Sequence, residues 1–136
     1  MTITASDNSV TTIIISGSDN AIGGLTISSS DDSAIHLEVG SGNTIAGGAF
    51  TSTESSGITV TMNESNTLSG ATITSSEFAQ ASVDLSGESN SNSGLTLTGS
   101  GYSVTTLSMP AISYSDTGRT VVSGMADNVE ISIPTV

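Results

Sequence analysis

The chain contains no cysteine and no lysine, and Arg119 is its only strongly basic residue. Without cysteine it can form neither disulfide bonds nor thiolate metal sites. Thirteen acidic residues against that single cation give a net charge of −12. Because proteins bind phosphate backbones through Lys and Arg, this charge balance excludes nucleic acid as a partner and disfavours anionic membranes.

Aromatic residues and long apolar runs are also scarce. Aromatic side chains make up 3% of the chain and Trp is absent, although 35% of the residues are hydrophobic. No apolar run approaches the length that spans a membrane, so no membrane insertion is expected. Residues 1–6 show neither the basic nor the apolar region of a signal peptide. The acidic composition, rich in Ser, Thr, Gly and Asn, is nevertheless typical of secreted or surface-layer proteins, and we expect an extracellular or cell-surface location.

A glycine followed by a short strand-like phrase recurs along the chain. Successive glycines are separated by 23, 23, 24 and 24 residues and stand at Gly24, Gly47, Gly70, Gly94 and Gly118. A fixed period of this length indicates a repeat architecture in which each unit packs only on its neighbours. The sequence therefore predicts an all-β, single-domain parallel β-helix (β-solenoid) over residues 1–136 with about six coils, regular over 18–98 and looser over 99–136.

Two families of strands, offset from each other, fit each repeat. The first follows the glycine and should bury one column of side chains: Ile27, Phe50, Ile73, Leu97 and Val121. The second alternates apolar and polar residues over 35–39, 58–62 and 81–85, with a last member at 129–133. The β-branched run 10–15 predicts a further buried strand. We expect two strands per coil, joined by turns rich in Gly, Ser, Asn and Asp.

An asparagine stands four residues before each of the first four glycines, at Asn20, Asn43, Asn66 and Asn90. These side chains are expected to stack as a ladder whose amides bond from rung to rung and satisfy backbone groups that the turns leave open. Two residues after each asparagine lies another inward position, and there the pattern slips at Asn92. The phrase Asn-x-Ile-x-Gly resembles the right-handed parallel β-helix repeats of the pectin-lyase-like superfamily. That resemblance covers roughly residues 18–98, implies the fold and brings no catalytic motif.

Enzymes of that superfamily are polysaccharide lyases and hydrolases with carboxylates on an outward strand face, usually beside Arg or Lys. Here the outward positions include His36, Glu38 and Asp84. Glu38 and Asp84 would lie two rungs apart, about 9.6 Å, which is near the carboxylate separation of inverting glycosidases. No Lys or Arg accompanies them, and no aromatic platform for a sugar is visible in the sequence. We therefore expect no enzyme, and polysaccharide cleavage ranks third among the hypotheses.

Acidic residues recur at the repeat spacing in the turns. Asp31, Glu54 and Glu77 are 23 residues apart and should form one column, and Glu64 and Glu88 a second. Like charges about 4.8 Å apart repel one another, and Ca²⁺ would relieve this because it binds carboxylate and carbonyl oxygens. The glycine- and aspartate-rich nonapeptide of calcium-binding β-rolls is absent. Solvated carboxylates without any cofactor are the expectation, with Ca²⁺ at Asp31, Glu54 and Glu77 as the alternative.

The most regular outward positions carry threonine. They are Thr2, Thr4, Thr26, Thr51, Thr72, Thr74, Thr96 and Thr98. A flat Thr-x-Thr array resembles the ice-binding face of β-helical antifreeze proteins, although Ala49 and Val122 interrupt it. Threonine is also common on any exposed strand because it is β-branched. The array could equally bind a glycan surface or dock against another solenoid.

No polar or helical cap, which solenoids normally carry at their ends, is visible in the sequence. The apolar residues expected at the two ends are Ile3, Val10, Ile13 and Ile15, and Val121, Val129, Ile131 and Ile133. Two complementary open ends favour a head-to-tail contact, which builds a filament if it does not close. The leading hypothesis is a non-catalytic structural subunit whose partner is itself, in an extracellular β-helical filament or surface layer. The alternative is an ice-binding or carbohydrate-binding β-helix that uses the threonine array.

Overall fold

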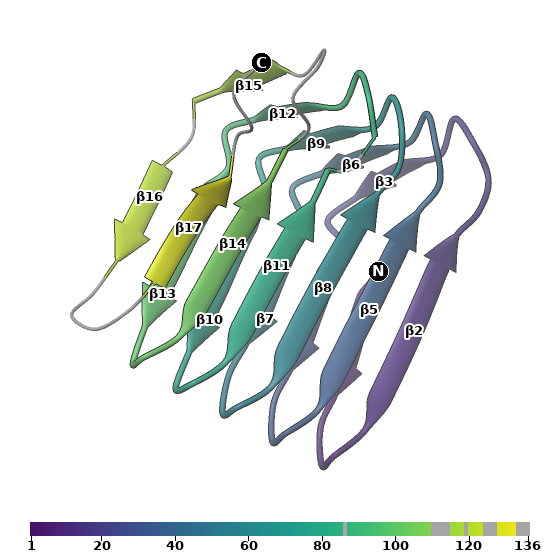
Figure 1. Cartoon of the computed structure of the whole chain (residues 1–136). Helices are drawn as coiled ribbons and strands as arrows, with labels where there is room; N and C mark the ends of the chain where they lie inside the picture. Colours follow the sequence, from purple (N-terminus) through teal and green to yellow (C-terminus); the bar gives the residue numbers. More distant parts are fainter. Residues whose placement is uncertain (86, 110–114, 119, 124–127, 133–136) are drawn as a thin grey trace.

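The computed structural model describes residues 1–85, 87–109, 115–118, 120–123 and 128–132 of the chain. These residues form only strands and turns, and the strands stack as a parallel β-solenoid (Figure 1). The predicted all-β solenoid is therefore confirmed.

Three parallel sheets run along the solenoid. Sheet A contains β1 (Thr2–Ala5), β4 (Thr26–Ser29), β7 (Ala49–Ser52), β10 (Thr72–Ser76), β13 (Thr96–Ser100) and β16 (Thr120–Ser123). Sheet B contains β2 (Val10–Ile15), β5 (Ala34–Val39), β8 (Gly57–Met62), β11 (Gln80–Asp84), β14 (Val104–Ser108) and β17 (Asn128–Ser132). Sheet C contains β3 (Ala21–Gly23), β6 (Thr44–Ala46), β9 (Thr67–Ser69), β12 (Ser91–Ser93) and β15 (Ser115–Thr117).

Each coil takes one strand from each sheet in the order A, B, C. The described strands make five complete coils and a partial sixth from β16 and β17. In Figure 1 sheet B lies in front, with sheets A and C behind it. The expectation of two strands per coil is wrong, because sheet C adds a third. Its strands have three residues, too few for an alternating pattern to be recognised in the sequence.

The recurring glycine forms the turn from sheet C into sheet A. All five glycines have φ between +59° and +67°, a left-handed conformation that glycine adopts without the steric cost of a Cβ. The N–H of Gly24 donates to the carbonyl of Ala46 in the next coil, at 2.9 Å, and Gly47 repeats this bond to Ser69 at 2.8 Å. The glycine thus sets the chain direction for the sheet A strand and links neighbouring coils.

The core column of sheet A is built as predicted over four coils. Ile27, Phe50, Ile73 and Leu97 are fully buried and lie in direct register. Val121 pairs with Leu97 but is 44% exposed, so the column stops before it. The prediction is wrong for Val121 because its coil has a described neighbour on one side only.

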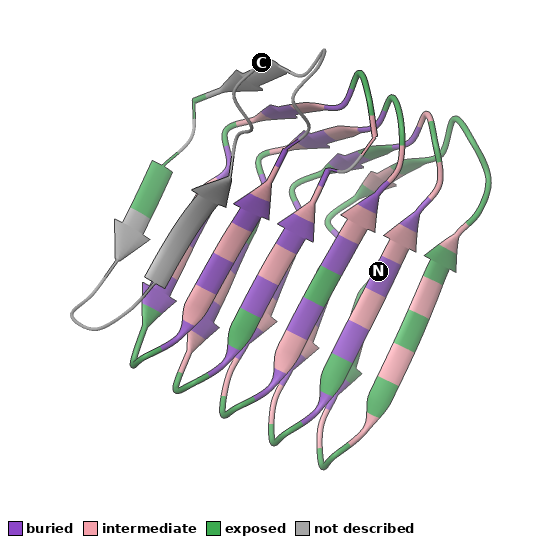
Figure 2. Ribbon diagram, viewed as in Figure 1, coloured by how far each residue is buried: buried purple, intermediate pink, exposed green. Residues whose placement is uncertain are grey.

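Strand β2 is not the buried strand that its composition predicts. Its residues alternate between exposed and half-buried, with Val10 and Ile14 outward and Ile13 and Ile15 inward. In Figure 2 it carries no buried residue, whereas its neighbour β5 alternates with buried positions. The reason is again position, since β2 lies at the edge of sheet B and no described coil covers its inward side chains.

Two irregular positions in the repeat are explained by packing. Gly48 replaces the usual larger residue because the ring of Phe50 fills that space, and a Cβ at Gly48 would lie 3.1 Å from two ring carbons. Asn92 does not mark a slip of the pattern. It pairs in register with Leu68 and is buried in the same inward column of sheet C.

Candidate functional site

The outward side of sheet A is an uncharged surface, here called the threonine face. The strand register aligns Thr2, Thr26, Ala49, Thr72, Thr96 and Thr120 in one column. Thr4, Ser28, Thr51, Thr74, Thr98 and Val122 align in a second column. Side chains within a column are therefore about 4.8 Å apart, and the columns are about 6.6 Å apart. The predicted threonine positions thus lie together, as a regular lattice of hydroxyl and methyl groups.

The four asparagines form a hydrogen-bonded ladder along one edge of sheet C. The Oδ1 atoms of Asn66 and Asn90 each accept the backbone N–H of the preceding asparagine, Asn43 and Asn66 respectively, at 2.7 Å. The Asn43 Oδ1 accepts both the N–H and the amide of Asn20, at 3.0 and 2.9 Å. Asn43, Asn66 and Asn90 are buried, whereas Asn20 is exposed. The ladder is directional, because each rung donates to the amide oxygen of the next.

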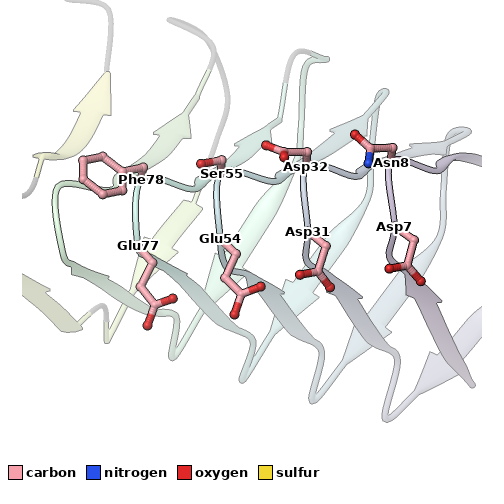
Figure 3. Close-up of a pocket in the computed structure, with 8 residues that line it drawn as sticks. All are labelled: Asp7, Asn8, Asp31, Asp32, Glu54, Ser55, Glu77 and Phe78. Carbon is pink, nitrogen blue, oxygen red and sulfur yellow. The ribbon is translucent and has the colours of Figure 1, made fainter.

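The turns between sheets A and B carry a row of carboxylates, here called the acidic turn row: Asp7, Asp31, Glu54 and Glu77. Figure 3 shows these side chains in line, with Asn8, Asp32, Ser55 and Phe78 forming a parallel line. All eight residues have φ between +54° and +66°. This strained conformation points backbone groups along the solenoid, so that Asp32 N–H bonds to Glu54 O and Ser55 N–H to Glu77 O, at 3.2 and 3.0 Å. The two lines border an open groove of about 660 Å³.

Two members of the acidic turn row, Asp31 and Glu54, shift each other's pKa. The contact with Glu54 and the hydroxyl of Ser30 lower the pKa of Asp31. The contact with Asp31 and the charge of Asp31, together with the charge of Glu77, raise the pKa of Glu54. The pair therefore holds a proton on Glu54 more readily than an isolated glutamate would, and both side chains stay in solvent.

The acidic turn row does not gather into a metal site. Among the residues that the structure describes, no three acidic or histidine side chains come together closely enough to hold a metal ion. Asp31, Glu54 and Glu77 lie in a line rather than around a point (Figure 3). Glu64 and Glu88 also lie in turns of adjacent coils, where Ser65 N–H bonds to Glu88 O at 2.9 Å. The calcium hypothesis gains no support from this geometry.

An aromatic pair, Phe78 and Tyr102, lies at one end of the acidic turn row. Their ring centroids are 5.5 Å apart with an interplanar angle of 5°. The side chains are 67% and 65% exposed, and both residues have positive φ. A bulky residue with positive φ is destabilised by about 1 to 2 kcal/mol. One stacked aromatic pair stabilises the fold by a similar amount. The sequence analysis did not single out this pair, although the 24-residue spacing of the two rings was a signal for it.

The candidate catalytic residues lie where the repeat predicts, on the outward side of sheet B. The register places Thr61 between Glu38 and Asp84, and aligns His36 with Thr59 and Ser82. These side chains are half-buried to exposed. The two described grooves lie at the turns, not on this sheet.

The coil ends match the expectation only in part. Ile3, Ile13 and Ile15 are half-buried against the core at the first coil, while Val10 points outward and is exposed. Ile22 of β3, which the end prediction did not include, is a further partly buried member of this end. At the other end Val129 and Ile131 lie in β17, paired with β14, and Ile133 falls outside the described residues.

Comparison with models of known protein families, with curated proteins and with solved structures finds no match for this chain. The described residues include no helix long and apolar enough to cross a membrane. The class that the structure defines is thus a three-sheet parallel β-solenoid, and its function has to be argued from its surfaces.

Proposed function

We propose that the protein is a non-catalytic structural subunit that stacks head to tail with further copies into an extracellular filament or surface layer. The observation that carries the proposal is the open edge of the first coil. Among the described strands, β1, β2 and β3 pair on one side only, and Ile3, Ile13 and Ile15 lie partly exposed above the core. Val121 presents a similar inward aliphatic side chain at the other end of sheet A.

A further coil of the same cross-section would satisfy this edge. The last described coil of a second copy, with β16 in sheet A and β17 in sheet B, would pair with the outer edges of β1 and β2, with a net gain of roughly 1 kcal/mol for each hydrogen bond. It would also bury the half-exposed isoleucines, whose transfer from water contributes about 25 cal/mol per Å². Unpaired strand edges are templates for pairing with the strands of another chain.

The asparagine ladder and the parallel strand pairing both have a direction along the solenoid. No described group donates to the Oδ1 of Asn20, whereas the same atom of each later asparagine accepts an N–H from the coil before it. A copy that arrives in parallel orientation would keep the strand direction of every described strand pair. An inverted copy would present antiparallel strands and could not. The contact is therefore heterologous, which produces open-ended growth when the rotation between copies does not close a ring.

A pair of lysine substitutions in β2 tests the proposal. Ile13→Lys places a charge in the inward, half-buried position, whereas Ile14→Lys adds the same charge to an outward side chain that is 63% exposed. We expect sedimentation velocity and negative-stain microscopy to show concentration-dependent filaments for wild type and Ile14→Lys, and monomers for Ile13→Lys. Thermal unfolding checks that Ile13→Lys is folded. Wild type that stays monomeric at high concentration in salt, or equal assembly of the two variants, would overturn the proposal.

The threonine face supports a second candidate, binding to ice or to a regular glycan surface. The supporting observation is the in-register lattice of hydroxyl and methyl groups without a charge among the described positions. Thr72→Lys on this face and Thr59→Lys on the outward side of sheet B are matched, because both threonines are exposed strand residues. Inhibition of ice recrystallisation, or binding to glycan arrays, that is lost only in Thr72→Lys would favour this candidate.

A further inference from the structure

The aromatic pair is placed where it contributes little to the core. Two of the four aromatic residues of the chain lie together on the surface. Both stand at turn positions with positive φ, where Asn or Gly would fit with less strain. Beside them, Glu77 and Glu54 line the groove that Phe78 closes at one end (Figure 3). Exposed rings next to carboxylates indicate a binding surface.

We propose that the aromatic pair and the adjacent carboxylates form a docking site for an arginine-bearing segment of a partner protein. A guanidinium group stacks on an aromatic face, carries its charge permanently and is more weakly hydrated than an ammonium group. Glu77 directly precedes Phe78, and Glu54 lies in the adjacent coil, so a side chain stacked on the ring would have carboxylates within the same groove.

The composition of the chain determines what the occupant can be. A second copy fits the site less well, because this chain has no lysine and a single arginine and so offers no further basic side chain for the acidic turn row. Anionic lipids and nucleic acids would be repelled by a groove whose charged groups are carboxylates and by a net charge of −12. A neutral sugar could stack on the rings but would gain nothing from the net charge of the groove. An extended basic peptide can stack one arginine on the aromatic pair and place further basic side chains beside the carboxylates of the acidic turn row.

The site lies along the side of the solenoid, so it is independent of end-to-end assembly. The test is fluorescence anisotropy of labelled octaarginine and octalysine at low salt, with the protein kept at a concentration where it is monomeric. We expect octaarginine to bind more tightly than octalysine, by at most about two- to fivefold, the size of one whole exposed cation–π contact. Phe78→Asn keeps the net charge and tolerates the turn conformation, and it should remove that preference.

Three further variants keep the result interpretable. Phe78→Leu retains an apolar side chain and the backbone strain but has no π face, and it should lose the preference as Phe78→Asn does. Glu77→Gln and Glu64→Gln change the net charge equally, but only Glu77 lines the groove beside Phe78. Glu77→Gln should therefore weaken octaarginine binding more than Glu64→Gln. Unchanged preference in both Phe78 variants, equal effects of the two glutamate variants, or displacement of the peptide by cellohexaose would overturn the proposal.

Discussion

Removing one amide from the middle of the asparagine ladder should have a large effect. In Asn66→Ala the buried N–H of Asn43 loses its acceptor, the Asn66 Oδ1 at 2.7 Å. The carbonyl of Asn63 also loses the Asn66 Nδ2 donor at 2.9 Å. A buried donor without a partner costs about 1 to 3 kcal/mol, and a second lost hydrogen bond adds roughly 1 kcal/mol. We expect a total destabilisation of about 2 to 4 kcal/mol, or a melting temperature lower by about 8 to 16 °C.

Urea denaturation and thermal unfolding followed by circular dichroism measure this loss. Asn20→Ala is the matched control, because Asn20 is exposed and its side chain makes one described hydrogen bond, to Asn43. That variant should cost less than about 1 kcal/mol. Asn66→Asp keeps an acceptor for the Asn43 N–H but has no amide donor, so it should fall between the two. A cost below about 0.5 kcal/mol for Asn66→Ala, or one equal to that of Asn20→Ala, would refute the ladder as a source of stability.

Three other measurements test the packing and the charged turns. In Gly87→Ala the new Cβ would lie 2.5 Å from two backbone atoms of the neighbouring coil, so a loss of about 2 to 4 kcal/mol is expected in urea denaturation. Gly57→Ala, with nothing within 4 Å of its Cβ, should be neutral or slightly stabilising, and similar losses in both would contradict the close approach. Ile73→Ala should cost about 2 to 5 kcal/mol by the same assay, since its side chain is fully buried in the middle of the core column. Because the pKa of Glu54 is raised in the folded state, its contribution to stability is present at low pH and is lost as pH rises above its ordinary value of 4.5. The lowered pKa of Asp31 has the opposite sign, and its contribution is lost as pH falls below 3.8. The melting temperature of wild type should therefore fall relative to Glu54→Gln between about pH 4.5 and neutral pH, and a difference that does not change with pH would contradict the shared proton.

The repeat could be predicted from the sequence because one physical requirement recurs in every coil. Each glycine has to adopt a positive φ at the same turn, and most inward residues of sheets A and B are apolar, with Ser29, Ser52, Ser75 and Thr105 as buried polar exceptions. Both requirements are therefore visible in the sequence as residue types that recur every 23 or 24 positions. Sheet C is harder to recognise in the sequence, because each of its three-residue strands has one inward position. In the fourth coil this position is occupied by a polar residue, Asn92.

The turns were harder to predict because their conformation is not tied to residue type. Asp31, Glu54 and Glu77 adopt positive φ without glycine, since hydrogen bonds between adjacent turns hold them there. A sequence pattern that looks for glycine or asparagine at such positions does not find them. The aromatic pair was missed for the same reason, because Phe78 and Tyr102 are not residues that a turn normally contains.

The distribution of charge over the solenoid separates the proposed interactions from one another. Carboxylates are concentrated at the turns, as in the acidic turn row, whereas the described positions of the threonine face carry none. Each copy carries a net charge of −12, so stacking copies brings like charges together. End-to-end assembly should therefore improve with added salt, which screens this repulsion, while arginine docking on the aromatic pair should weaken. Binding through the threonine face should change little, because no charge is involved. One salt titration should therefore change the strengths of the three interactions differently. Each proposed interaction can then be tested separately from the other two.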